Sequence, residues 1–322
     1  MDNVSIDGPI HKIGFFLVPN FSLIAFSSAV EPLRLANYIA NAALYGWTCY
    51  SVDGGPVTAS NGVSVAVDAA YSDVDVLPTV IVCGGFDIHK QSHPSLVSKL
   101  RRLSSHGAAI GAVCTGSNIL AEAGLLDGYK CTIHWENLSG FTERFPDLEI
   151  TDELYEIDRN RFTCAGGTAA LDMILNIIAQ QCGHDTAALT ADLLIHHRIR
   201  DGHESQRMAL RSRLGVSHPK LLAVISHMEE TLEEPVSCAG LARTVNLSTR
   251  QLERLFRKYL NNAPTRYYLE LRLSRARFLL LQTSMPILDV ALACGFVSAS
   301  HFSKCYREYF ARTPSEERMV PA

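Results

Sequence analysis

Two stretches near the C-terminus repeat one pattern: Leu241-Ala-Arg-Thr-Val-Asn-Leu247 and Val290-Ala-Leu-Ala-Cys-Gly-Phe296. Each begins with two small or apolar residues. After two further residues comes a tight turn, at Val245-Asn-Leu247 in the first stretch and Cys294-Gly-Phe296 in the second. A basic stretch comes next, in which Leu252 and Phe256 correspond to Phe302 and Tyr306, with one extra residue in the second turn. A short helix, a tight turn and a basic helix form the helix-turn-helix motif. The repeat therefore predicts an all-α domain with two helix-turn-helix motifs.

Local signals indicate where these helices begin. An amphipathic helix with apolar residues from Leu221 to Leu232 is expected to stop at Pro235. Ser237 is a plausible N-cap for the next, short helix. Ser248 starts the first basic helix, and Gln251 three residues later completes a capping box.

A long helix from Pro264 to about Thr283 is predicted between the two copies, with proline at its first position. Its apolar residues can pack both motifs onto one rigid spine. Two basic helices held in this way could enter successive major grooves, about 34 Å apart, on one face of a DNA duplex.

Before about residue 190, short apolar runs alternate with helical stretches. Strands are expected at 13–18, 80–83, 108–113 and 162–165, with glycine after several of them. Helices are expected at 21–41, where Pro32 interrupts the helix or marks its true start, at 118–123, and from after Thr168 to Gln181. This alternation predicts a doubly wound, mostly parallel, flavodoxin-like sheet whose ligands bind at the carboxyl ends of the strands. The expected fold class is α/β, followed by the all-α domain.

Composition excludes several classes of protein. Of 322 residues, 47% are hydrophobic and 19% are charged, which is typical of a globular chain. No apolar run reaches about 18 residues and no export signal is present, so we expect a cytoplasmic protein that does not bind membranes. The nine cysteines are scattered without a Cys-x-x-Cys pair, which argues against disulfides and structural zinc.

No cofactor and no bound metal are expected. His196 and His197 lack a second ligand pair at metal spacing, and His184 and His203 are isolated. Solvated helix faces explain these histidines better than a zinc site does.

Charge separates the two ends of the chain. Up to Val216 there are 15 Lys and Arg against 23 Asp and Glu, a balance of −8; the remainder has 14 against 10, a balance of +4. A basic C-terminal part indicates a polyanionic partner such as double-stranded DNA. The predicted domains are a sensing domain at 10–190, a linker helix and polar linker at 191–217, and a DNA-binding domain at 218–322.

The C-terminal domain resembles that of the AraC/XylS regulators along its entire length. The residues that carry this resemblance are Pro264–Leu273 with Ala276 and Arg277, Ala291 with Cys294-Gly-Phe296, Ser300–Lys304, and Thr313-Pro-Ser315. Two departures stand where that family usually has glycine: Asn261-Asn-Ala263 and Ala311. Asn tolerates a left-handed backbone; Ala311 fits less well, although a helix end can close in other ways.

The predicted DNA contacts lie on the two basic helices. Arginine can bond guanine bidentately and glutamine can do the same with adenine, and these pairings suit the first helix. The predicted base-reading residues are Arg250, Gln251 and Arg254 on the first helix and Ser300, His301 and Lys304 on the second. The predicted phosphate anchors are Ser248, Lys258, Ser298 and Arg307. A solvated helix face is the alternative for each arginine.

Cys114 follows a predicted strand and precedes a predicted helix, within Gly111-Ala-Val-Cys-Thr-Gly116. This is the arrangement of a nucleophile elbow, and the following helix N-terminus is expected to favour a thiolate. Residues 10–185 resemble the ThiJ/PfpI class of the glutamine amidotransferase-like superfamily. In enzymes of that class a cysteine works with a histidine and an acidic residue, and the matching positions here are Cys114, His134 and Glu31. Thr115 stands where many hydrolytic relatives have histidine.

The combined sequence resembles regulators that respond to glycine betaine, carnitine, methylglycines or arginine, through residues 29–37 and 157–168. This resemblance implies a small amino-acid-like or methylated-amine effector. Glu31 could face a cationic nitrogen, Trp135 could offer a cation–π contact, and backbone near Gly84-Gly85 and Gly166-Gly167 could hold a carboxylate. The predicted effector pocket consists of Glu31, Gly84, Gly85, Cys114, Thr115, His134 and Trp135.

The sequence therefore predicts a non-enzymatic, ligand-responsive DNA-binding regulator. We expect an activator that forms a homodimer through its N-terminal domain and acts with RNA polymerase. Two alternatives stay open: a cysteine hydrolase or amidase localised by its DNA-binding tail, and a redox sensor acting through Cys114.

Overall fold

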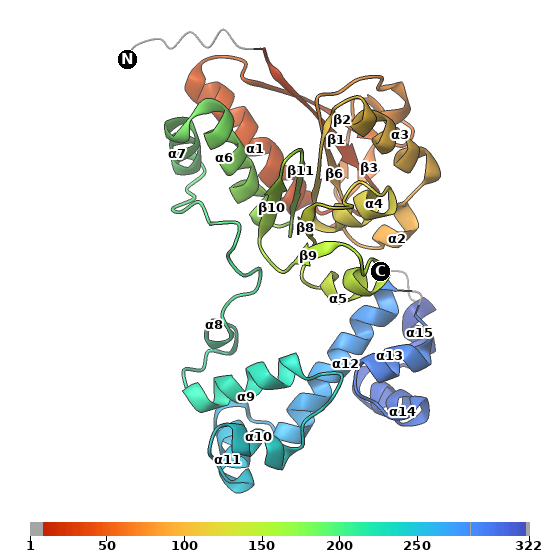
Figure 1. The fold of residues 1–322 in the computed structure, drawn as a ribbon, viewed down its shortest axis with the longest axis vertical. Helices are drawn as coiled ribbons and strands as arrows, with labels where there is room; N and C mark the ends of the chain where they lie inside the picture. Colours follow the sequence, from red (N-terminus) through yellow and green to blue (C-terminus); the bar gives the residue numbers. More distant parts are fainter. Residues whose placement is uncertain (1–8, 284, 320–322) are drawn as a thin grey trace. The chain divides into compact units, whose positions relative to one another are not determined.

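A seven-stranded sheet forms the centre of the N-terminal unit (Figure 1). The computed structural model describes residues 9–283 and 285–319, and the chain divides into units of residues 1–206 and 207–322. The strand order is β10-β11-β7-β6-β1-β2-β5, and every neighbouring pair is parallel except β10 and β11. The strands are β1 (His11–Leu17), β2 (Tyr45–Ser51), β5 (Ala69–Ala70), β6 (Thr79–Cys83), β7 (Ala109–Val113), β10 (Tyr155–Asp158) and β11 (Arg161–Cys164). The predicted mostly parallel sheet is confirmed.

Helices cover both faces of this sheet (Figure 1). One layer consists of α1 (Leu23–Ala40), α6 (Ala169–Cys182) and α7 (His184–Leu193), and the other contains α3 (Pro94–Ser105) and α4 (Ser117–Glu122). Successive side chains of a strand point to opposite faces, so Phe15 packs into the first core and Phe16 into the second. Because both faces are buried, the central strands are continuously apolar rather than alternating.

The shorter elements of this unit lie around the sheet. They are β3 (Val57–Thr58) paired with β4 (Ser64–Val65), β8 (Lys130–Thr132) paired with β9 (Glu149–Thr151), the helices α2 (Ile88–Gln91) and α5 (Leu138–Arg144), and the single turns η1 (Tyr71–Asp73) and η2 (Cys114–Gly116).

Pro32 lies inside a continuous helix. α1 begins at Leu23, where the Ser22 side chain accepts a hydrogen bond from the N–H of Ala25, and Pro32 is buried. The idea that Pro32 marks the true start of this helix is therefore wrong, because Ser22 is the N-cap and the first helical residue is Leu23.

The C-terminal unit is helical and has two small cores on one spine. Its helices are α8 (Leu210–Leu214), α9 (Pro219–Glu230), α10 (Cys238–Thr244), α11 (Thr249–Leu260), α12 (Pro264–Gln282), α13 (Ile287–Ala293), α14 (Ala299–Phe310) and α15 (Pro314–Met319). α12 contributes Tyr268 to the first core and Leu273, Ala276 and Leu280 to the second. The predicted spine, the Ser237 cap and the capping box at Ser248 are confirmed. α9 ends at Glu230, short of Leu232.

Residues 194–206 belong to the N-terminal unit, since the boundary falls between Gln206 and Arg207. This part of the predicted linker is held by side-chain contacts rather than free. His196 follows α7, and its Nε2 lies 2.8 Å from the buried carboxylate of Asp172. The expectation of a solvated helix face is wrong for this histidine, because its ring contacts the carboxylate of Asp172 on α6.

Ala311 ends α14 in the left-handed conformation, with φ 58°, and Asn261 ends α11 in the same way, with φ 48°. The helix end therefore does not close in another way. An L-residue with a Cβ is strained there, whereas glycine is not.

Ala311→Gly should raise the free energy of unfolding of the C-terminal unit by about 1 kcal/mol, because it removes this strain. Urea unfolding of the full chain, followed by circular dichroism, measures the change. Asn261→Gly is the matched control and should raise the free energy of unfolding by less, because Asn tolerates this conformation better than Ala. A loss of stability in Ala311→Gly would contradict the argument.

Candidate functional site

Cys114 occupies a sharp turn between β7 and α4. It is the first residue of η2, it has φ 59°, and only 9% of its surface is exposed. A non-glycine residue with this backbone is uncommon and marks a functional or strained position. The geometry is that of an elbow at the carboxyl end of a central strand.

Neighbouring glycines make this turn possible by letting backbone approach it closely. Gly166 has φ 92°, and a Cβ built there would lie 2.8 Å from the Cα of Cys114. A Cβ on Gly116 would lie 2.4 Å from the carbonyl oxygen of Val82. A side chain at either position would push the elbow out of place.

The thiol of Cys114 is protonated at neutral pH. Burial raises its pKa to about 12, the Thr115 backbone N–H opposes that rise, and the nearby Glu136 carboxylate adds to it. The expectation that the helix N-terminus favours a thiolate is therefore wrong here, because loss of solvent outweighs the backbone dipoles.

His134 and Glu136 form the acid–base part of this region. The N–H of Glu136 donates to Nδ1 of His134 at 3.4 Å, and that nitrogen lies 3.8 Å from the Glu136 carboxylate. Burial lowers the pKa of His134 and raises that of Glu136. Since Nδ1 accepts a hydrogen bond, the neutral ring carries its proton on Nε2 and can donate it to a ligand.

Glu136, rather than Glu31, is the carboxylate that lies near enough to Cys114 to raise the pKa of its thiol. Glu31 lies on α1 with its carboxylate 2.6 Å from the guanidinium of Arg34 and 45% of its side chain exposed. The assignment of Glu31 to the acidic position is corrected accordingly. The spacing His134-x-Glu136 was the signal in the sequence that the prediction did not use.

The predicted glycines and Thr115 hold backbone together instead of lining a cavity. A Cβ on Gly84 would lie 2.3 Å from the N of Gly116, and one on Gly85 would lie 1.9 Å from the carbonyl oxygen of Asn20. The N–H of Gly84 donates to Val113, and the Thr115 hydroxyl donates to Gly85 at 2.6 Å. The Gly84 N–H and the Thr115 hydroxyl are therefore already used in hydrogen bonds within the protein.

Trp135 is half-buried beside His134, with ring centroids 5.7 Å apart. A hollow of about 290 Å³ opens at the carboxyl ends of β1 and β2 and does not include the predicted effector residues. It is lined by Leu17, Pro19, Ser51, Val52, Asp53, Pro56, Val57 and Thr58.

On the first recognition helix, α11, the predicted DNA contacts are all exposed. Leu252 and Phe256 are buried, whereas Arg250, Arg254 and Lys258 face solvent. Gln251 is different, because its Oε1 accepts the Ser248 N–H at 2.8 Å in the capping box. A glutamine that uses its oxygen in this way cannot bond adenine bidentately, so that predicted role is not available while the box is formed.

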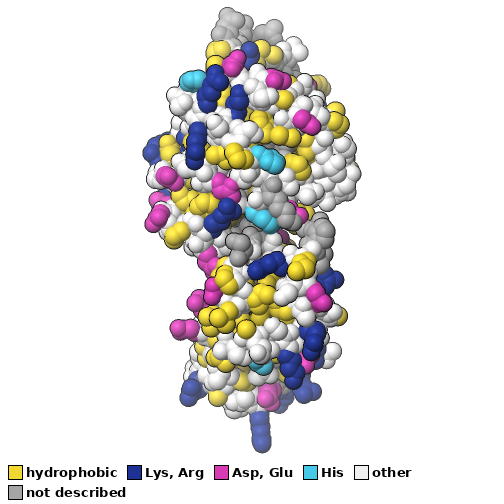
Figure 2. All heavy atoms as spheres, turned by 90° about the vertical axis from the view of Figure 1, so that its right-hand side faces the viewer, with side chains coloured by type: hydrophobic (Ala, Val, Ile, Leu, Met, Phe, Trp, Pro, Cys, Tyr) yellow, Lys and Arg dark blue, Asp and Glu magenta, His cyan; other side chains and the backbone are white. Residues whose placement is uncertain are grey.

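The second recognition helix, α14, repeats this arrangement. The Ser298 side chain caps it by accepting the N–H of His301 at 3.2 Å. Lys304 lies 4.0 Å from Glu308, an exposed contact that costs little to break. The predicted residues Ser298, Ser300, His301, Lys304 and Arg307 are exposed. Figure 2 shows several Lys and Arg side chains exposed on this helical unit.

Arg272 of α12 fixes the second motif to the spine. Its guanidinium donates to the carbonyl oxygens of Cys294 and Gly295, each at 2.7 Å, and lies 4.1 Å from the centre of the Phe296 ring. Gly295 has φ 73°, and a Cβ there would lie 2.5 Å from Pro235 in the loop before α10. The two motifs therefore have a fixed separation. Arg272 lies within the stretch Pro264–Leu273 that carries the family resemblance, but its pattern gave no sign of this role.

Comparison with known proteins agrees with this architecture. Residues 241–319 match a helix-turn-helix domain family, and residues 11–180 match the DJ-1/PfpI family. The chain is 50% identical to the HTH-type transcriptional regulator GbdR of Pseudomonas aeruginosa over 95% of this chain and 84% of the relative. It is 47% identical to the regulator CdhR of the same species, over 95% of this chain and 91% of the relative. The chain belongs to the AraC family of helix-turn-helix transcriptional regulators.

This AraC-family regulator carries an N-terminal DJ-1/PfpI domain. A crystal structure of an AraC family regulator from Pseudomonas putida matches with a TM-score of 0.53 and 29% identity, over 58% of this chain and 100% of that one. An enzyme, isonitrile hydratase of Pseudomonas putida, is 31% identical over only 42% of this chain and 58% of its own length. Full-length similarity is thus to transcriptional regulators, and DNA binding through the two motifs follows.

Two kinds of feature are absent from the residues that the structure describes, 9–283 and 285–319. No helix among them is long and apolar enough to cross a membrane. Within the same residues, no group of three or more His, Cys, Asp or Glu side chains is placed to hold a metal ion.

Alkylation of Cys114 by iodoacetamide should rise about tenfold per pH unit from pH 7 to pH 10 without levelling. A raised pKa leaves the unreactive thiol dominant below about pH 12, so the thiolate fraction keeps increasing over this range. Peptide mapping by mass spectrometry measures the rate, and glutathione is the control because an ordinary thiol levels near pH 9. A plateau for Cys114 at or below pH 9 would contradict the assignment.

Proposed function

We propose that the chain is an effector-controlled transcriptional activator whose sensor site is the region of Cys114, His134, Trp135 and Glu136. The observation that carries this proposal is that one chain combines a buried, protonated thiol at the elbow and two exposed basic recognition helices. The full-length similarity to transcriptional regulators supports it.

The chemistry of the site suits a small molecule with a cationic and an anionic end. The Glu136 carboxylate and the face of Trp135 can stabilise a quaternary or protonated nitrogen. The Nε2–H of neutral His134 can donate to a carboxylate. Glycine betaine, carnitine, methylglycines and arginine all carry these two ends, so this effector class is proposed for the chain.

The hydrolase and redox-sensor alternatives both require a reactive thiolate. Burial raises the pKa of Cys114 to about 12, which leaves a very small thiolate fraction at neutral pH. His134 is neutral and cannot stabilise a thiolate by charge, because burial lowers its pKa. These properties favour a binding role over nucleophilic or redox chemistry.

Effector binding would bias arrangements in which both C-terminal units engage DNA half-sites. A homodimer formed through the N-terminal unit would place two such units on one operator, and RNA polymerase is the proposed partner for activation. Arg250 and Arg254 are proposed to read bases, with Lys258 and Arg307 on phosphates.

Arg254→Ala should weaken binding to a selected operator by about 10- to 100-fold, because one base-reading arginine contributes about 1–3 kcal/mol. Lys258→Ala should weaken binding to all DNA sequences similarly and should reduce the slope of log affinity against log salt concentration by about 1. Fluorescence anisotropy at several salt concentrations measures both. Arg102→Ala removes an exposed arginine of the N-terminal unit and is the control. Equal binding by Arg254→Ala and Arg102→Ala would contradict the assignment.

At least one compound among glycine betaine, carnitine, methylglycines and arginine should raise the melting temperature of the full chain in a concentration-dependent way, since a ligand stabilises the state it binds. Trp135→Leu should abolish that rise. Trp47→Leu is the matched control, since the chain has two tryptophans and Trp47 lies on β2. If no compound shifts the melting temperature, or if Trp47→Leu abolishes the shift equally, this site and effector class are wrong.

A further inference from the structure

The strap, residues 194–206, is the segment that leaves α7 and ends where the C-terminal unit begins at Arg207. It contains no regular helix or strand, yet two clusters of side-chain hydrogen bonds fix it to the N-terminal unit. A segment without secondary structure keeps one path only if such contacts hold it.

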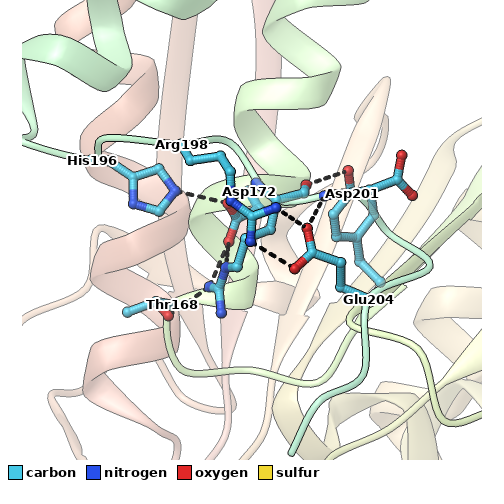
Figure 3. Close-up of polar contacts among 8 residues, drawn as sticks. Thr168, Asp172, His196, Arg198, Asp201 and Glu204 are labelled. Carbon is cyan, nitrogen blue, oxygen red and sulfur yellow. Dashed lines mark hydrogen bonds and ion pairs between the residues drawn. The ribbon is translucent and has the colours of Figure 1, made fainter. Parts of the chain in front are cut away.

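The first anchor is the carboxylate of Asp172 on α6, which is fully buried (Figure 3). Its Oδ1 lies 2.8 Å from Nε2 of His196 and accepts the N–H of Arg200 at 2.8 Å. Its Oδ2 accepts the Arg200 guanidinium at 2.6 and 2.9 Å. The same guanidinium donates to the hydroxyl of Thr168 at 2.7 Å. A buried carboxylate is stable only while such partners are present.

The second anchor is Gln206, the last residue of the strap. Its Nε2 lies 2.9 Å from the Thr132 hydroxyl and from the carbonyl oxygens of Ile133 and Glu153. The adjoining backbone is tied in as well, because the N–H of Leu154 donates to the carbonyl oxygens of Gly202 and Glu204 at 2.9 and 3.0 Å.

The first anchor uses a residue close to Gly166, which packs on Cys114, and the second uses the residue before His134. Thr168 follows the Gly166-Gly167 turn, and Gly166 packs so closely on Cys114 that a Cβ there would lie 3.1 Å from its Sγ. Ile133 directly precedes His134. The two ends of the strap therefore rest on the two loops that form the proposed effector site.

We propose that the strap relays the state of the Cys114–His134 site to the DNA-binding unit. A ligand that shifts the Gly166-Gly167 turn or the His134 loop moves the acceptors of Arg200 and Gln206. Because Asp172 cannot stay buried without its partners, the strap is held or released as a unit, which gives two discrete states. The inference rests on the proposed function for the ligand, but the coupling itself is a property of this chain.

Coupling is reciprocal, so loosening the strap must also loosen the elbow. In the full chain without ligand, Gln206→Ala and Arg200→Lys should each raise iodoacetamide labelling of Cys114 several-fold, as measured site by site by mass spectrometry. Labelling of buried Cys83 and Cys294 should stay unchanged. Arg102→Ala, which removes an exposed ion pair of the same unit, should leave the labelling rate of Cys114 equal to that of the original chain.

An unchanged Cys114 rate in both strap variants overturns the proposal. An equal rise at Cys83 also overturns it, since this would report opening of the whole unit. Because Gln206→Ala leaves Asp172 and its partners in place, it keeps the test valid if Arg200→Lys folds poorly.

A second experiment tests whether the strap transmits ligand binding to DNA binding, with glycine betaine as the probe. If betaine changes the operator affinity of the original chain, the strap variants should still show its melting-temperature shift but lose at least three-quarters of the affinity change. Retention of the full change overturns the relay. If betaine has no effect on the original chain, that member of the proposed effector class fails, and the ligand-free labelling decides the relay independently.

Discussion

The close backbone packing around Cys114 is the constraint on which the N-terminal unit depends. β6 and β7 end side by side, and the chain must turn there with Cys114 in a left-handed conformation. Glycine at 84, 85, 116 and 166 permits this, because a Cβ at any of them would meet a neighbour at less than 3 Å. The same packing excludes water, and that exclusion raises the pKa of the thiol. One steric arrangement thus sets both the shape of the elbow and the raised pKa of its thiol.

The C-terminal unit solves a different problem, which is to hold two small motifs at a fixed separation. Each motif has only a small core of its own, centred on Leu252 and Phe256 or on Phe302 and Tyr306. The spine α12 crosses from one core to the other, and Arg272 binds the turn of the second motif through two carbonyl oxygens. A helix-turn-helix pair that reads two grooves needs this rigidity, because a variable separation would cost ordering free energy at each binding event.

A buried carboxylate anchors the segment that leads from the N-terminal unit to the DNA-binding unit. Asp172 has no solvent contact, and it is stabilised by His196 and Arg200 from the segment that leads to the DNA-binding unit. In an interior of low dielectric constant, loss of either partner would be costly, so these contacts hold the segment in place although it contains no regular helix or strand. An exposed pair such as Arg102 with Asp75 carries no comparable constraint.

The sequence by itself determined the features that depend on local periodicity and capping: the parallel sheet, the spine helix, the cap at Ser237 and the capping box at Ser248. The repeated motif also determined the DNA-binding class, because its whole pattern lies in the consecutive stretch from Leu241 to Tyr306. Tertiary structure alone decided that Glu136 rather than Glu31 lies near enough to Cys114 to raise its pKa, and that His196 and Arg200 converge on Asp172. It also decided the protonation of Cys114, because desolvation depends on every segment that covers a group and not on its neighbours in the chain.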